Sequence, residues 1–141
     1  MFPGYGALLE THRGYDFGAL LMARGLAKAL RARLVTSTVS RLVIDLNRSI
    51  GHPQLLSAAT RVAPAAVRAT IVERHYRPFR EEVERFVGHS QSRGRRVIHI
   101  SSHSFTPELH GKVRRADVGL LYDPARRPES ELCARWKQAR H

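Results

Sequence analysis

The sequence predicts an α/β fold in which helices cover both faces of a sheet. The 141-residue chain is 43% apolar and 26% charged, which is typical of one globular domain. Short runs that are apolar throughout alternate with amphipathic helical patterns, and a strand without a polar face must be covered on both sides. No run approaches the roughly 20 uncharged apolar residues of a membrane span. We therefore expect a three-layer domain without a membrane segment.

The first elements follow from residue spacing. Apolar residues at helical intervals predict a helix over 17–32, with Asp16 as its candidate N-cap. Short β-branched runs predict strands over 34–37 and 42–46. The segment 48–57 contains glycine and proline and predicts a loop.

The later elements repeat the alternation. A helical pattern covers 64–88, and we expect it to kink or break at Pro78, which cannot donate a helical hydrogen bond. Apolar runs predict strands over 96–102 and 117–122, and the last helix is expected over 128–139.

Charge and cysteine content limit the function classes. Lysine and arginine total 24 against 12 acidic residues, and this excess of +12 raises the expectation of a polyanionic partner. The arginines are spread along the chain without a recognition motif, so a nucleic-acid-binding domain is the least favoured alternative. Cys133 is the single cysteine, which excludes an internal disulfide and a cysteine zinc cage. The first residues lack a signal-peptide pattern, and we expect a cytoplasmic protein.

Histidines in two segments are candidate metal ligands. His12 precedes the first helix, and Asp16 four residues later could bind the same ion or orient the imidazole. His103 lies at the end of a predicted strand, where a metal ligand or general base is expected. In the alternative interpretation Asp16 only caps the helix, and His12 is an ordinary loop residue. His99 lies deeper in the strand and is expected to pack in the core.

A third segment offers groups that bind anions. Asn47 and Arg48 follow a predicted strand, and an arginine fork binds carboxylates in a bidentate manner. Arg41, at the start of that strand, could supply a second cation. Alternatively, Asp45 and Arg48 form an ordinary surface pair. Together with the histidines, these residues predict a metal-assisted hydrolase that acts on an anionic substrate.

Four strings resemble the N-formylglutamate amidohydrolase family: THRGYDFGAL, STVSRLVIDLNRS, HYRPFREEV and HISSHSFTPELHGKVRRADVGLLYDPAR. They occur in the family's order and cover most of residues 10 to 128. The resemblance implies a zinc-carboxypeptidase-like (phosphorylase/hydrolase-like) three-layer α/β fold with a mixed sheet. It also implies hydrolysis of the C–N bond of N-formylglutamate, as in histidine breakdown, or of a related N-acyl amino acid.

The resemblance also assigns roles to residues. It implies zinc on His12 and His103, with Asp16 as a further ligand or as the partner of a ligand. The pair Asn47–Arg48 resembles the carboxylate-binding pair of zinc carboxypeptidases, and Arg41 would help to hold the substrate.

Family members carry an upstream strand with a Cys-Glu-His-Gly-Gly-like motif and a downstream catalytic glutamate. We therefore expect residues 1–141 to be one partial domain of this family, in which no catalytic residue is assigned. We expect it to bind zinc weakly and to hydrolyse little alone. The alternative is a non-catalytic remnant, an anion-binding module of the same fold.

Overall fold

A computed structural model describes residues 4, 6–9, 11, 14–109 and 111–139. The chain forms two compact units, Met1–Phe105 and Thr106–His141. No helix in the described part is long and apolar enough to cross a membrane. The single domain predicted over 1–141 stays a prediction.

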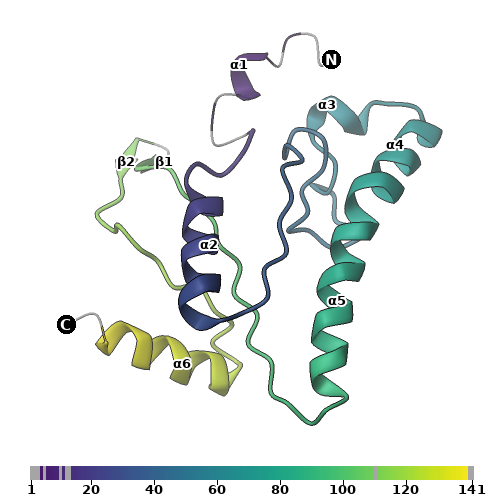
Figure 1. Ribbon diagram of the computed structural model, residues 1–141. Helices are drawn as coiled ribbons and strands as arrows, with labels where there is room; N and C mark the ends of the chain where they lie inside the picture. The colour runs from purple at the N-terminus through teal and green to yellow at the C-terminus, as the bar shows by residue number, and fades with distance from the viewer. Residues whose placement is uncertain (1–3, 5, 10, 12–13, 110, 140–141) are drawn as a thin grey trace. The chain divides into compact units, whose positions relative to one another are not determined.

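The regular secondary structure described in the first unit is helical (Figure 1). Its helices are α1 (Gly6–Leu9), α2 (Ala19–Leu30), α3 (Ala58–Arg61), α4 (Ala65–Ile71), the π-helix η1 (Val72–Tyr76) and α5 (Arg77–Gln91). The helix predicted over 17–32 is confirmed as α2, and α4, η1 and α5 account for the helix predicted over 64–88. In Figure 1 these three run on as one long helix.

A kink or a break is predicted at Pro78, and the structure shows an interruption of the regular helix there but no end of the helix. The Arg77 amide donates to the carbonyl of Val72, five residues earlier, so the helix widens into a π turn immediately before the proline. Such a turn is a common way to accommodate a residue that disturbs the regular ladder. The helix therefore passes Pro78 without ending.

The core of this unit lies between the loop after residue 41 and the long helix. Ile44, Leu55 and Tyr76 are buried together, with exposures of 0, 7 and 5%. The segment 42–46 contributes to this core but is not the predicted strand. The hydroxyls of Ser57 and Thr60 bind its carbonyls at Leu42 and Val43, so side chains of the α3 region take the place of a neighbouring strand.

Three other predicted strands are also absent as strands. The segments 34–37, 96–102 and 117–122 make no backbone–backbone hydrogen bonds to other described residues. Ile98 is 64% exposed and Leu121 is 99% exposed, so their apolar side chains stay uncovered there. A strand requires a partner that accepts its hydrogen bonds, and the described residues provide none. The three-layer α/β architecture therefore stays a prediction.

The second unit contains a small hairpin and a helix. Strands β1 (Glu108–Leu109) and β2 (Lys112–Val113) are antiparallel, with Glu108 opposite Val113 and Leu109 opposite Lys112. The helix α6 (Arg127–Gln138) has a proline in its first turn and confirms the helix predicted over 128–139.

Candidate functional site

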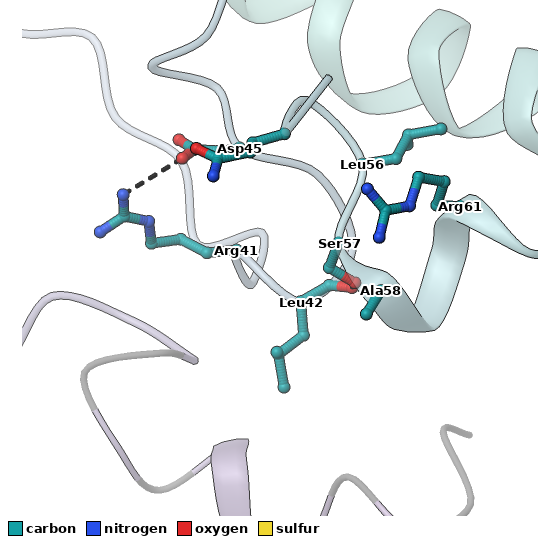
Figure 2. Close-up of a pocket in the computed structure, with 8 residues that line it drawn as sticks. Arg41, Leu42, Asp45, Leu56, Ser57, Ala58 and Arg61 are labelled. Carbon is teal, nitrogen blue, oxygen red and sulfur yellow. Dashed lines mark hydrogen bonds and ion pairs between the residues drawn. The ribbon is translucent and has the colours of Figure 1, made fainter. Parts of the chain in front are cut away.

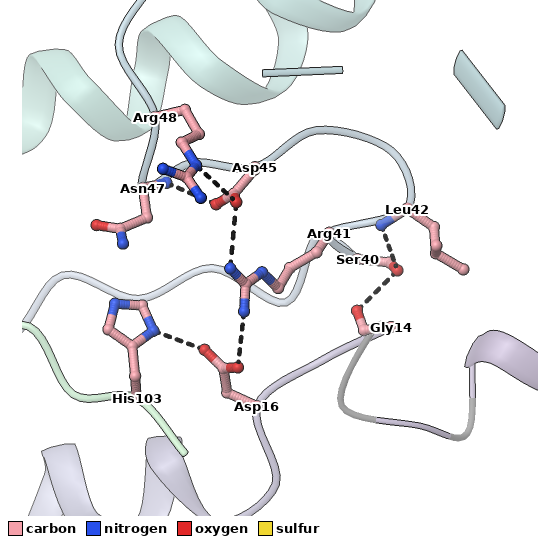
Figure 3. A network of polar contacts seen from close by, with 9 residues as sticks. All are labelled: Gly14, Asp16, Ser40, Arg41, Leu42, Asp45, Asn47, Arg48 and His103. Atoms are coloured by element: carbon pink, nitrogen blue, oxygen red, sulfur yellow. Dashed lines mark hydrogen bonds and ion pairs between the residues drawn. The ribbon is translucent and has the colours of Figure 1, made fainter. Parts of the chain in front are cut away.

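Five charged or titratable side chains form a continuous chain in the first unit (Figure 3). His103 Nδ1 lies 2.7 Å from Asp16 Oδ2, and the other oxygen of Asp16 accepts from Arg41 at 3.1 Å. Arg41 also donates to Asp45 at 3.1 Å, and Asp45 lies 3.5 Å from Arg48 Nε. Basic side chains and carboxylates alternate along this chain, which we call the ion-pair chain. It connects the candidate metal ligand His103 to the candidate anion-binding Arg48.

Asp16 fixes the position of His103 at the start of α2. The hydroxyl of Ser102 donates to the carbonyl of Ala19 at 2.8 Å, which anchors the neighbouring backbone. Asp16 does not cap α2 as predicted, because its carboxylate is engaged by His103 and Arg41. The N-cap position is instead Gly18, with a φ of 74° and no side-chain cap. The carboxylate is thus used to organise the site.

Arg41 is held from two sides by acids. Burial alone would lower its pKa, but the hydrogen bonds and charges of Asp45 and Asp16 outweigh this effect and raise the pKa above its ordinary value. The guanidinium therefore carries its positive charge at neutral pH. Arg41 was predicted to bind substrate, and the structure shows it engaged with two carboxylates of the chain itself.

Arg48 and Asn47 are the candidate anion-binding groups whose side-chain donors are least engaged by the described residues. The Nε of Arg48 is covered and faces Asp45, while its terminal nitrogens have no acceptor within the described residues. The side-chain amide of Asn47 is likewise without a partner there, although its backbone amide donates to Asp45 at 3.1 Å. The surface pair Asp45–Arg48, considered as an alternative, is therefore present as part of the larger chain. It leaves the outer edge of the guanidinium open to a ligand.

Contacts with the backbone of Gly14 hold Arg41, the middle member of the ion-pair chain, in place. The carbonyl of Gly14 accepts from the Ser40 hydroxyl at 2.8 Å and from the Arg41 amide at 3.0 Å. Gly14 is buried, and a Cβ there would press against the carbonyl oxygens of Leu8 and Leu9. Only glycine fits this position without movement of the backbone.

Tyr76 of η1 supports the Arg48 end of the ion-pair chain. Its hydroxyl donates to the carbonyl of Arg48 at 2.8 Å, and its ring is buried in the core. The long helix thereby holds the backbone from which the side chain of Arg48 extends.

A pocket of about 450 Å³ adjoins the ion-pair chain (Figure 2). Arg41 and Asp45 line it on one side, and residues of the following loop and α3 complete its wall. The remaining lining residues are Leu42, Gln54, Leu56, Ser57, Ala58 and Arg61.

The predicted metal ligands are only partly described by the structure. His12 lies outside the described residues. Asp16 and His103 are in contact, but no three His, Cys, Asp or Glu side chains among the described residues gather closely enough to hold a metal ion. His99 is exposed, so its predicted burial in the core is wrong, because no described segment covers 96–102.

Sequence reasoning missed the central role of Asp45. This residue follows Arg41 by four positions and precedes Arg48 by three, a spacing that would have suggested a double pairing. It was treated only as half of a surface pair, because the segment was interpreted as a strand. The role of Tyr76 carries no signal in the sequence, since its contact with Arg48 spans 28 residues.

Comparisons with known proteins identify the family of the chain. The model of the N-formylglutamate amidohydrolase family matches residues 6–139. A solved structure, that of gene product Atu2144 from Agrobacterium tumefaciens, is similar at 32% identity with a TM-score of 0.77. That match covers 84% of this chain and 50% of the other, so the chain spans about half the length of that structure. No curated protein matches. The chain belongs to the N-formylglutamate amidohydrolase family.

Proposed function

We propose that the chain carries the substrate- and metal-binding part of a metal-dependent amidohydrolase. The reaction would cleave the C–N bond of N-formylglutamate or of a related N-acyl amino acid. The observation that carries the proposal is the ion-pair chain, which joins a histidine to an arginine with open donors in a protein of this family.

The contact between His103 and Asp16 supports a role for His103 as a zinc ligand. A histidine that ligates a metal usually gives its other ring nitrogen to a carboxylate, which fixes its orientation and raises its basicity. Asp16 occupies Nδ1 of His103 in this way, and Nε2 has no partner among the described residues. We propose that His103 binds zinc through Nε2 with His12 as a second ligand, and that Asp16 orients His103. Bound zinc would supply a Lewis acid for the acyl carbonyl and a water whose pKa is lowered towards about 7.

Arg48 and Asn47 would bind a carboxylate of the substrate. The guanidinium offers its two terminal nitrogens as a fork, and the adjacent amide can donate a further hydrogen bond. Asp45 lies 3.5 Å from Nε of Arg48, and the two terminal nitrogens have no acceptor among the described residues. The ion-pair chain would thereby set the position of the substrate relative to His103.

Titration calorimetry with zinc and with N-formylglutamate tests this proposal. The change His103→Ala should lower zinc affinity at least tenfold, because it removes a zinc ligand. Mutation of the hydrogen-bond partner of such a ligand alone lowers metal affinity about 10–100-fold. His89→Ala, an exposed histidine on α5, is the matched control and should leave zinc affinity unchanged.

Arg48→Gln should instead weaken N-formylglutamate binding about tenfold, because a charge-assisted hydrogen bond is lost, while zinc affinity is retained. Equal effects of the His103 and His89 changes on zinc would contradict the metal role. The protein could instead bind N-formylglutamate through Arg48 and show no zinc-dependent turnover, even when the remaining family segments are supplied. That result would identify the chain as a non-catalytic anion-binding module.

A further inference from the structure

We propose that arginines around the second half of α5 form a surface that binds single-stranded nucleic acid through its phosphates and bases, without a preferred sequence. The members of this arginine surface are Arg33, Arg85, Arg93, Arg95 and Arg96. It shares no residue with the ion-pair chain, so the inference does not depend on the proposed function.

Two of these arginines lie over one aromatic ring. Cζ of Arg33 is 5.1 Å from the centroid of the Phe86 ring, and Cζ of Arg85 is 5.3 Å from it. Arg85 follows Glu81 and Glu82 by one turn of α5, the spacing of a helical ion pair, yet its guanidinium lies over the ring instead. Phe86 is half-buried and both arginines are exposed, so the ring holds two cations at the protein surface.

The end of α2 directs Arg33 towards this ring. The chain leaves the helix through Arg31, which has a φ of 49°, and the Ala32 amide donates to the carbonyl of Ala27 at 2.9 Å. Glycine is the usual residue at such a left-handed helix end, and here an arginine occupies it. The turn allows Arg33 to reach a ring on α5 that is far away in the sequence.

The other three arginines follow the end of α5. The amide of Arg95 donates to the carbonyl of Ser90 at 3.1 Å, which keeps the segment 92–95 at the end of the helix. Arg85 precedes this end by about 9 Å along the helix axis. Successive phosphates of a stacked strand are about 3.4 Å apart along its axis. The two groups of arginines can therefore bind different phosphates of one strand.

The charge of the arginine surface is not compensated within the described part of the chain. None of its five arginines forms an ion pair or a side-chain hydrogen bond with a described residue. The sequence has no acidic residue between positions 17 and 44 or between positions 85 and 107. Arginine binds phosphate oxygens with two parallel hydrogen bonds, so this surface has the chemistry of a phosphate-binding strip.

The guanidinium planes favour a single strand over other polyanions. One face of each plane lies over Phe86, and the opposite face of these exposed side chains can stack on a base. Val97 and Ile98, which are 38 and 64% exposed, offer apolar contact to further bases. The bases of a duplex are already stacked on one another, and an acidic polypeptide carries no base at each charge.

Fluorescence anisotropy of a labelled oligothymidylate with the full 141-residue protein tests this proposal. We expect a Kd of roughly 1–100 μM at physiological salt, and a logarithm of affinity that falls with the logarithm of salt concentration by about 0.7 per phosphate contact. The double change Arg33→Gln, Arg85→Gln should reduce this slope by about 1.4, since two contacts are lost. The matched control is Arg126→Gln, Arg127→Gln, which removes the same charge from arginines paired with Glu129 and Glu131 and should leave the slope unchanged.

A change of Phe86 separates stacking from charge. Phe86→Leu keeps every arginine, so the salt slope should stay the same while affinity falls about twofold to fivefold, as for loss of an exposed cation–π contact. Equal slopes in the two double variants would overturn the assignment of the surface. Competition by duplex DNA or by poly-glutamate that equals competition by unlabelled oligothymidylate would overturn the choice of ligand. Absence of salt-dependent binding would overturn the proposal as a whole.

Discussion

His103 and Asp16 lie 87 positions apart in the sequence, yet Nδ1 of the histidine and Oδ2 of the aspartate are 2.7 Å apart. The side chain of Asp16 is 16% exposed and that of His103 is 41% exposed, so a well-covered carboxylate holds a ring that stays accessible. This contact connects the two segments that the sequence singled out for metal binding. It also sets which nitrogen of His103 remains available.

Asp16→Asn should destabilise the protein and weaken zinc binding. The amide cannot balance the charge of Arg41, and removing one member of a largely covered pair should cost about 1–2 kcal/mol of unfolding free energy. Zinc affinity should fall about 10–100-fold, as for other partners of metal-binding histidines. Urea unfolding and zinc titration measure the two effects.

The control for Asp16→Asn is Glu73→Gln, which breaks an exposed pair with Arg77 on the helix surface. That change should cost less than about 0.5 kcal/mol. Equal destabilisation by the two changes would show that the ion-pair chain contributes no more than a surface pair.

Arg41→Gln should give a loss of stability that does not vary with pH between about pH 7 and 10. The pKa of Arg41 is raised above its ordinary value, despite the opposing effect of burial, by Asp45 and Asp16. Its stabilising charge is therefore fully present below the unfolded-state pKa and is lost only as the pH rises through the higher folded-state value. Because the side chain is 37% exposed and screened by solvent, we expect a loss of about 1–2 kcal/mol.

Urea unfolding of both proteins at several pH values checks the Arg41 prediction. A difference that shrinks as the pH rises from about 7 to 10 would contradict the assignment of a permanently charged Arg41.

Tyr76→Phe should weaken carboxylate binding by Arg48 without removing any group that contacts the ligand. The change deletes the hydroxyl that donates to the Arg48 carbonyl at 2.8 Å, and such a bond contributes about 0.5–1.5 kcal/mol. Calorimetry with N-formylglutamate and urea unfolding measure both consequences. Tyr122→Phe, at a tyrosine that is 44% exposed, is the control and should alter neither quantity.

Ile44→Ala should cost about 2–4 kcal/mol, because the side chain is fully buried and its loss leaves a cavity. Ile50→Ala makes the same chemical change at a side chain that is 57% exposed. This control should cost much less, within about 1 kcal/mol. Thermal unfolding of the two variants should separate them clearly, and similar melting temperatures would show that Ile44 is not at the centre of the core.

The helices could be predicted from the sequence because their signals are local. Apolar spacing and a proline in the first turn locate α6 to within about a residue of its observed ends, Arg127 and Gln138. The π turn before Pro78 was not foreseen, since the proline rule says only that the regular ladder is disturbed. It does not say how neighbouring residues absorb the disturbance.

The strands could not be predicted in the same way, because a strand depends on residues elsewhere in the chain. The segment 42–46 has strand-like residues, but hydroxyls from Ser57 and Thr60 bind its carbonyls. Similarly, Asp16 has the residue type and the position of an N-cap. Its contacts with His103 and Arg41, which are distant in the sequence, become visible only in the folded chain. Residue types identified the members of the ion-pair chain better than they identified the contacts between them.

The open backbone of 96–104 affects how firmly the site is ordered. These nine residues form no backbone–backbone hydrogen bonds to the described chain, so the Ser102 and His103 side-chain contacts tether them near α2. Their amide hydrogens should exchange quickly with solvent, whereas those of the long helix should be protected. A ligand that bridges His103 and Arg48 would have to offset the conformational entropy of this segment. Affinity at this site is therefore coupled to the local free energy of ordering residues 96–104.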